Sequence, residues 1–167
     1  MTYDIRHACD EDVPAVHDIL LSEHVLDGTM RLPYQPLSYT QTRLAPENGI
    51  FKLVALDEAR VVGFSELITY PNAPRQRHAG EINMIVTHPD WLGKGVGAAL
   101  MAAMLSLADD WLRLKRVGLV VWVGNDSAVR LYERFGFVIE GTMPAYVFRR
   151  GAYIDAYHMG RVLLDRS

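Results

Sequence analysis

Several features that define classes of protein are missing from this sequence. Cys9 is the only cysteine, so no intrachain disulfide is possible and nothing indicates an oxidising compartment. No stretch reaches the ~18 consecutive apolar residues of a membrane span, and the first residues lack the ~7–15-residue apolar segment of a signal peptide. The sequence therefore predicts a cytoplasmic protein without a membrane partner, in which Cys9 is a small packed residue.

An excess of positive charge is missing as well. The chain has 17 lysines and arginines against 20 aspartates and glutamates, which gives a formal net charge of -3. Because binding to a nucleic acid backbone needs a basic field, we expect no nucleic acid partner, and an anionic cofactor would have to be bound by local groups. Half of the residues are hydrophobic and 22% are charged, and this balance and length predict one folded domain over residues 1–167.

The first part of the chain predicts a strand, a helix and a hairpin. Polar and apolar residues alternate over 3–8, and acidic capping residues precede the helical spacing of 13–20. Glycine and proline in 22–46 favour a loop with at most one short helix, at 37–44. Two apolar runs joined by a short polar link predict a hairpin over 51–69.

The second part alternates strands with helices and contains a glycine-rich turn just before residue 96. The predicted strands are 80–87, a continuous apolar run at 116–123, one that starts at 137–141, and 154–163. The predicted helices are 96–111 and 126–135, the second closed by Gly136.

The glycine-rich turn is the first motif that carries chemistry. Gly93, Gly95 and Gly97 alternate between a strand and a helix. Without side chains, the backbone N–H groups of such a turn approach an anion at the helix N-terminus, where the helix dipole also favours negative charge. Lys94 adds a cation, and the backbone of Val96 belongs to the same turn. The alternative is tight packing, and the spacing fits neither a Rossmann fingerprint nor a Walker loop.

A second motif, read together with the glycine-rich turn, indicates a family. Residues 125–137 read Asn-Asp-Ser-Ala-Val-Arg-Leu-Tyr-Glu-Arg-Phe-Gly-Phe, after Gly-Lys-Gly-Val-Gly at 93–97. In this order and spacing the two motifs resemble the GNAT superfamily of N-acetyltransferases, and the likeness covers nearly the whole chain. It implies an α/β (α+β) fold with a mixed, mostly antiparallel sheet of about six to seven strands and about four helices, in the order β-α-α-β-β-β-α-β-α-β-β. It also implies a V-shaped splay between the fourth and fifth strands.

The resemblance implies acetyl-CoA as co-substrate and no metal. The turn at 93–97 then holds the pyrophosphate, and Asn125 contacts the pantetheine arm. Ile85 and Val86 lie on the strand whose backbone pairs with that arm like an added strand. Leu92 departs from the glutamine or arginine that is usual at its place, which removes one polar contact but leaves the backbone cradle intact.

Two residues are predicted to be catalytic. Tyr132 matches the tyrosine at the cofactor sulfur, where a phenol protonates the departing thiolate; its alternative role is a core aromatic. Glu81 stands where some family members have a general base, acting directly or through water; its alternative role is a solvent-facing strand residue. His78 is a second candidate base, whereas His88 is assigned to the turn before Asp90.

The last part of the chain, residues 139–159, resembles a bacterial branch that acetylates free amino acids or similar small amines. This likeness implies that Arg149 binds a substrate carboxylate and that Leu26, Met30 and Tyr34 line a side-chain pocket. Packing and dimer contacts are the alternative roles of these residues. The resemblance also implies a homodimer.

Other acceptors and another function stay open at this point. Related folds acetylate protein N-termini or amine-bearing toxins and antibiotics, and a non-catalytic acyl-CoA sensor is a further alternative. For an enzyme we expect direct attack of the amine in a ternary complex without an acyl-enzyme, because Cys9 lies far along the chain from the cofactor motifs.

Overall fold

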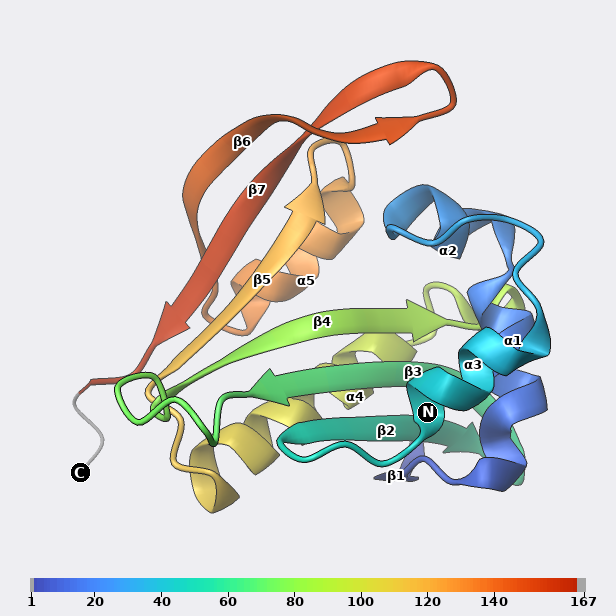
Figure 1. Ribbon diagram of the computed structural model, residues 1–167, viewed down its shortest axis with the longest axis horizontal. Helices are drawn as coiled ribbons and strands as arrows, with labels where there is room; N and C mark the ends of the chain where they lie inside the picture. The colour runs from blue at the N-terminus through green and yellow to red at the C-terminus, as the bar shows by residue number, and fades with distance from the viewer. Residues whose placement is uncertain (1, 165–167) are drawn as a thin grey trace.

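The computed structural model describes residues 2–164, so both ends of the domain predicted for 1–167 lie outside it (Figure 1). In this part of the chain the strands are β1 (Asp4–His7), β2 (Ile50–Asp57), β3 (Arg60–Thr69), β4 (Ala79–Thr87), β5 (Arg116–Trp122), β6 (Val138–Arg149) and β7 (Ala152–Val162). The helices are α1 (Val13–Leu20), α2 (Glu23–Gly28), α3 (Leu37–Leu44), α4 (Val96–Ser106) and α5 (Asp126–Arg134). The short turns are η1 (Asp10–Asp12), η2 (Pro89–Trp91) and the π-helical η3 (Leu107–Trp111). None of these helices is long and apolar enough to cross a membrane.

The strands form one seven-stranded sheet in the order β1-β2-β3-β4-β5-β7-β6. Every neighbouring pair is antiparallel except β4 and β5, which are parallel. The predicted α/β class with a mixed, mostly antiparallel sheet is confirmed.

Two apolar clusters cover the two faces of this sheet. One contains Leu100 and Met104 of α4, and the other contains Val16 and Ile19 of α1. Val61 and Val62 are neighbours in β3 but belong to different clusters, as expected for side chains that alternate between faces. The sheet is therefore fixed from both sides, which gives its central strands a defined position.

Strands β4 and β5 separate soon after they pair. They are hydrogen-bonded only where Ala79–Glu81 meet Arg116–Gly118. Beyond this point they diverge, and Figure 1 shows a wedge between β4 and the unit formed by β5, β6 and β7. This is the splay predicted between the fourth and fifth strands. Within the wedge, the edge of β4 that faces β5 has no strand partner in residues 2–164.

A β-bulge interrupts β4 inside this wedge. Glu66 pairs with Met84 and Leu67 pairs with Ile82, so Asn83 is an additional residue between two paired ones. In a regular strand residues two apart share a face, yet Ile82 packs in the cluster of α4 and Met84 in the cluster of α1. The bulge therefore turns Glu81 to the same side as Met84, away from α4.

The structure contains one helix more than predicted. Helix α2 occupies Glu23–Gly28, within the segment for which a loop with one short helix was expected. Its first turn forms because Ser22 O accepts hydrogen bonds from the N–H groups of Val25 and Leu26, and Val25 is buried in the core. Only six residues long, it shows too little periodicity to be recognised from sequence. The helix predicted at 37–44 is confirmed as α3.

The prediction that Cys9 is packed is wrong, because its side chain is exposed. Cys9 lies between β1 and η1, where the chain turns at the surface. Its backbone N–H donates to Asp12 Oδ2 at 2.8 Å, and its sulfur lies 3.3 Å from the same oxygen. Arg6 fixes this carboxylate with an Nη1–Oδ2 distance of 2.7 Å. The polar turn, rather than the core, accounts for the position of Cys9.

Candidate active site

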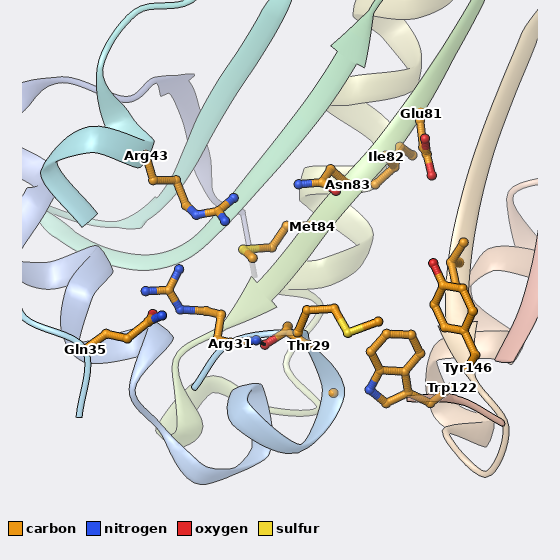
Figure 2. Close-up of a pocket in the computed structure, with 13 residues that line it drawn as sticks. Thr29, Arg31, Gln35, Arg43, Glu81, Ile82, Asn83, Met84, Trp122 and Tyr146 are labelled. Atoms are coloured by element: carbon orange, nitrogen blue, oxygen red, sulfur yellow. Dashed lines mark hydrogen bonds between the residues drawn. The ribbon is translucent and has the colours of Figure 1, made fainter. Parts of the chain in front are cut away.

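A pocket of about 300 Å³ opens on the face of β4 that carries Met84. Its walls come from the segment after α2, from α3, from the bulged part of β4, from the end of β5 and from β6 (Figure 2). The lining residues are Gly28, Thr29, Met30, Arg31, Gln35, Arg43, Glu81, Ile82, Asn83, Met84, Val120, Trp122 and Tyr146. A cavity of this size suits a small molecule.

Aromatic side chains close one side of the pocket. Trp122 ends β5 and Tyr146 extends from β6, with their ring centroids 5.7 Å apart. The indole Nε1 of Trp122 is buried without a hydrogen-bond partner among residues 2–164. Together with Met30 and Met84, these rings provide an apolar surface that carries an unused donor.

Two arginines lie on the opposite side of the pocket from Trp122 and Tyr146 (Figure 2). Arg43 Nη1 donates to Glu66 Oε2 at 2.5 Å, and Glu66 is itself buried. Arg31 has no such pairing: its Nε and Nη2 are buried, and no described residue accepts a hydrogen bond from them. Burial and the nearby Arg43 lower the pKa of Arg31, while Glu66 acts in the opposite direction.

Glu81 lies at the far end of the pocket from these arginines (Figure 2). Tyr70 donates a hydrogen bond from its hydroxyl to Glu81 Oε2 at 3.3 Å. Burial is the main cause that raises the pKa of Tyr70, and the negative charge of Glu81 adds to it, so the phenol stays a donor. The carboxylate is thus oriented by one hydrogen bond and only partly buried, which leaves it accessible to water or to an amine.

The glycine-rich turn leads into α4, as predicted. Gly95 is the N-cap residue of α4 with φ of 85°, and Gly93 has φ of 73°. A Cβ added at either residue would meet no atom within 4 Å, so the turn faces open space at the helix N-terminus. Tyr3 Oη donates to Lys94 O at 2.7 Å and anchors the turn. The side chain of Leu92 is half exposed.

The start of α4 is in close contact with α5 and β4. A Cβ on Gly97 would lie 3.3 Å from Leu131 Cδ2 and 3.9 Å from Ile85 Cγ2, so glycine permits this approach. Val96 is buried in the core, which leaves only its backbone for the turn. Ile85 pairs with β3 on one side, and with Val86 it lies beyond the point where β4 leaves β5. The predicted cofactor residues of the turn and of β4 therefore border the same wedge.

Helix α5 carries the second motif into the wedge. Asn125 is its N-cap residue, and Asn125 Oδ1 accepts a hydrogen bond from the N–H of Ala128 at 3.4 Å. Tyr132 is packed against the core cluster, with its ring centroid 6.2 Å from that of Phe137. Burial raises the pKa of Tyr132 to about 12. The phenol is consequently a stable proton donor at neutral pH, as an acid for a thiolate must be.

The residues predicted to contact substrate are distributed differently. Met30 lines the pocket, whereas Leu26, Tyr34 and Arg149 do not. Tyr34 is 95% exposed, and Arg149 Nη1 donates to Asp27 O at 3.0 Å, which ties β6 to α2. The residues that sequence reasoning missed are Arg31, Arg43, Trp122 and Tyr146. They share no local motif, because the fold brings them together from four separate segments.

The predicted histidine roles are partly settled by these contacts. His88 Nδ1 accepts from the N–H of Asp90 at 3.1 Å, which confirms that it belongs to the turn. The backbone carbonyl of His78 accepts from the N–H groups of Lys115 and Arg116 next to the β4–β5 pairing. Of these two candidate bases, Glu81 lines the pocket and His78 does not.

Comparison with known proteins decides the family. The sequence profile of the Acetyltransferase (GNAT) family matches residues 13–137. This chain belongs to the GNAT family. It is 39% identical over 158 residues to the L-amino acid N-acetyltransferase AaaT of Escherichia coli (strain K12), covering 95% of this chain and 96% of that protein. It is therefore an N-acetyltransferase, as the two motifs predict, rather than a non-catalytic sensor.

Solved GNAT structures share the fold over almost the whole chain. A phosphinothricin acetyltransferase from Sinorhizobium meliloti in complex with AcCoA has a TM-score of 0.85 and 27% identity, covering 98% of this chain and 89% of that one. A spermidine N-acetyltransferase from Vibrio cholerae in complex with CoA and spermine has a TM-score of 0.84 and 25% identity, covering 96% and 95%. The predicted GNAT fold is confirmed, and these relatives act on different small amines.

The residues of this GNAT protein fit coenzyme A. The open space beside Gly93 and Gly95 suits a diphosphate at the N-terminus of α4. The unpaired edge of β4 offers backbone groups to an extended amide-bearing chain. The side-chain amide nitrogen of Asn125 is not used in capping α5. The wedge thus leads from the glycine turn toward the pocket.

We predict that Gly95→Ala weakens coenzyme A binding about tenfold, because the added methyl group enters the space at the helix N-terminus. Gly151→Ala is the matched control: its φ is 83°, a Cβ there also meets no atom within 4 Å, and it lies between β6 and β7. Both changes cost about 1–2 kcal/mol of backbone strain. Calorimetric titration measures the affinity, and an equal loss in both variants would contradict the prediction.

We predict that Tyr132→Phe lowers kcat about 100-fold and leaves coenzyme A affinity within about twofold, because it removes only the proton donor. The Tyr132 phenol can donate a proton only below its pKa, and burial raises this pKa to about 12. The ratio of wild-type to variant kcat should therefore stay constant from about pH 7 to 10. A ratio that halves near pH 10, the ordinary pKa of a phenol, argues against this role.

Proposed function

We propose that this enzyme transfers the acetyl group of acetyl-CoA to the α-amine of a free L-amino acid. The relative with 39% identity over 95% of the chain is an L-amino acid N-acetyltransferase, which supports this acceptor class. The observation that carries the proposal is the charge of the pocket: two arginines and one glutamate line it. A polyamine carries only positive charge and suits such a lining poorly, whereas a zwitterion has a partner for each of its charges.

The proposed chemistry divides between two side chains. Acetyl-CoA supplies the acetyl group as a thioester. Glu81 accepts the proton of the substrate ammonium, directly or through water, and the amine then attacks. As the C–S bond breaks, Tyr132 donates a proton to the departing sulfur, and the second proton lost by the nitrogen restores the phenol. The backbone of Gly93 to Gly97, the edge of β4 at Ile85 and Val86, and Asn125 hold the donor in place.

We propose direct attack in a ternary complex. The exposed Cys9 is hydrogen-bonded at the turn after β1 and does not line the pocket, so it has no place in the transfer. Rapid quenching should find no acetylated enzyme, and double-reciprocal plots should intersect. Parallel plots would contradict this mechanism.

A homodimer and a cytoplasmic location remain predictions. Strands β7 and β6 end the sheet on one side (Figure 1), and large apolar side chains on them are exposed. These are Val138, Ile139, Tyr146, Phe148, Tyr153 and Val162. An exposed apolar surface of this kind is typical of an interface, which supports a second copy as its partner.

The acceptor class is tested by release of free thiol from acetyl-CoA. We expect turnover with free L-amino acids, aromatic residues and methionine first, because Met30, Met84, Trp122 and Tyr146 form an apolar wall. Spermidine, a short peptide with a free N-terminus and an amine-bearing antibiotic form the contrast set. Higher kcat/KM for any of these than for every free amino acid would overturn the proposal.

We predict that Glu81→Gln lowers kcat/KM about 100-fold near pH 7, because the ammonium then loses its base. The deficit should shrink as the pH passes the pKa of the amine, since the neutral amine needs no base. Tyr70→Phe is the control, because it removes the hydrogen bond to Glu81 and keeps the carboxylate. A deficit that stays constant with pH would assign Glu81 a structural role.

A further inference from the structure

The guanidinium of Arg31 is the group in the pocket that the residues described so far leave unsatisfied. Its Nε and Nη2 are buried, and neither has a hydrogen-bond partner within residues 2–164. A buried cationic donor without an acceptor is costly, so such groups are normally paired. The two unpaired nitrogens are those whose N–H groups point the same way, which is the side-on fork that receives two carboxylate oxygens in parallel.

The surroundings of Arg31 do not supply that carboxylate. The nearest acid is Glu66, but its Oε2 already accepts from Arg43 Nη1 at 2.5 Å. Arg43 repels Arg31 and Glu66 attracts it, but the hydrogen bond of Glu66 Oε2 goes to Arg43, so Arg31 Nε and Nη2 have no carboxylate partner among the described residues. Glu81 lies at the far end of the pocket (Figure 2). Arg31 therefore lines a cavity of about 300 Å³ whose one lining carboxylate, Glu81, is at the opposite end (Figure 2).

A second buried donor belongs to the same cavity. Trp122 Nε1 is without a partner in the described part of the chain, and Trp122 lies across the pocket from Arg31 (Figure 2). Two unused donors, one of them cationic, favour a ligand rich in acceptor oxygens. These donors therefore suit an anionic group better than a second cation.

We propose, resting on the proposed function, that Arg31 binds the α-carboxylate of the free amino acid through its Nε and Nη2. Asn83 and Met84 lie between the arginines and Glu81 (Figure 2), so a carboxylate at Arg31 directs the adjacent amine toward the bulge of β4. The amine is then too far from Glu81 for direct proton transfer, and a water molecule carries its proton to Glu81. Arg31 is a specificity-determining residue in this arrangement.

The proposal separates free amino acids from peptides. In a peptide N-terminus the carboxyl group beside the α-amine is an amide, which has one acceptor oxygen and no charge. Such a substrate leaves one N–H of the fork unpaired and the cation uncompensated. Polyamines fail for the same reason, because they bring no anion. One side chain therefore excludes two of the alternative acceptor classes.

The experiment compares a free L-amino acid with its own carboxamide, for wild type and Arg31→Gln. Wild type is expected to prefer the acid by about 100-fold in kcat/KM. In Arg31→Gln the value for the acid should fall about 100-fold and that for the carboxamide by less than about threefold. The ratio of the wild-type preference to the Arg31→Gln preference is independent of the difference in basicity between the acid's amine and the carboxamide's amine. Arg75→Gln, an exposed arginine outside the pocket, is the control and should keep the wild-type preference.

The outcomes distinguish this inference from the proposed function. Turnover of free amino acids with the same preference in wild type and Arg31→Gln would overturn the role of Arg31 and leave the function intact. Absence of turnover with every free amino acid would overturn both. If Arg31→Gln fails to fold, inhibition of wild type decides: the N-acetylated amino acid should inhibit more strongly than its carboxamide, and equal inhibition would refute the proposal.

Discussion

The active site depends on how briefly two parallel strands are hydrogen-bonded. Strands β4 and β5 pair over Ala79–Glu81 and Arg116–Gly118 and then diverge. A longer pairing would close the wedge and use the backbone groups of β4 that are free for a cofactor chain. The apolar clusters on both faces of the sheet stabilise β4 in this half-paired state. Packing and pairing with β3, rather than pairing with β5, therefore position the site.

The wedge divides the chemistry between its two sides. Helices α4 and α5 border it with backbone N–H groups and a partly buried phenol, which suit a phosphorylated thioester. The opposite face of β4 carries the pocket with its arginines and Glu81. In the proposed mechanism the reacting atoms meet where these regions join, at the bulge. The phosphinothricin and spermidine acetyltransferases share the fold of both regions with this chain.

Local sequence patterns predict the cofactor side of the wedge, at α4 and α5, but not the pocket on the opposite face of β4. The glycine turn and the α5 motif could be identified because the two motifs, taken together in this order and spacing, resemble the GNAT superfamily. Arg31 follows a helix too short to show periodicity, and its unpaired state depends on Glu66 being taken by Arg43. Arg149 was a reasonable candidate for a carboxylate from composition, but the fold places it against Asp27. Tertiary contacts decide which arginine is available, and sequence spacing does not contain them.

The bulge at Asn83 has a further consequence for alignments of relatives. The residues before it and after it lie out of phase by one position along β4. A homologue that lacks this single residue would have a regular strand in which the residues equivalent to Ile82 and Met84 are adjacent, so they would still face opposite sides and the acid equivalent to Glu81 would keep its side. A one-residue gap here is therefore compatible with the same base, because the bulge accommodates the extra residue without reorienting the strand on either side of it.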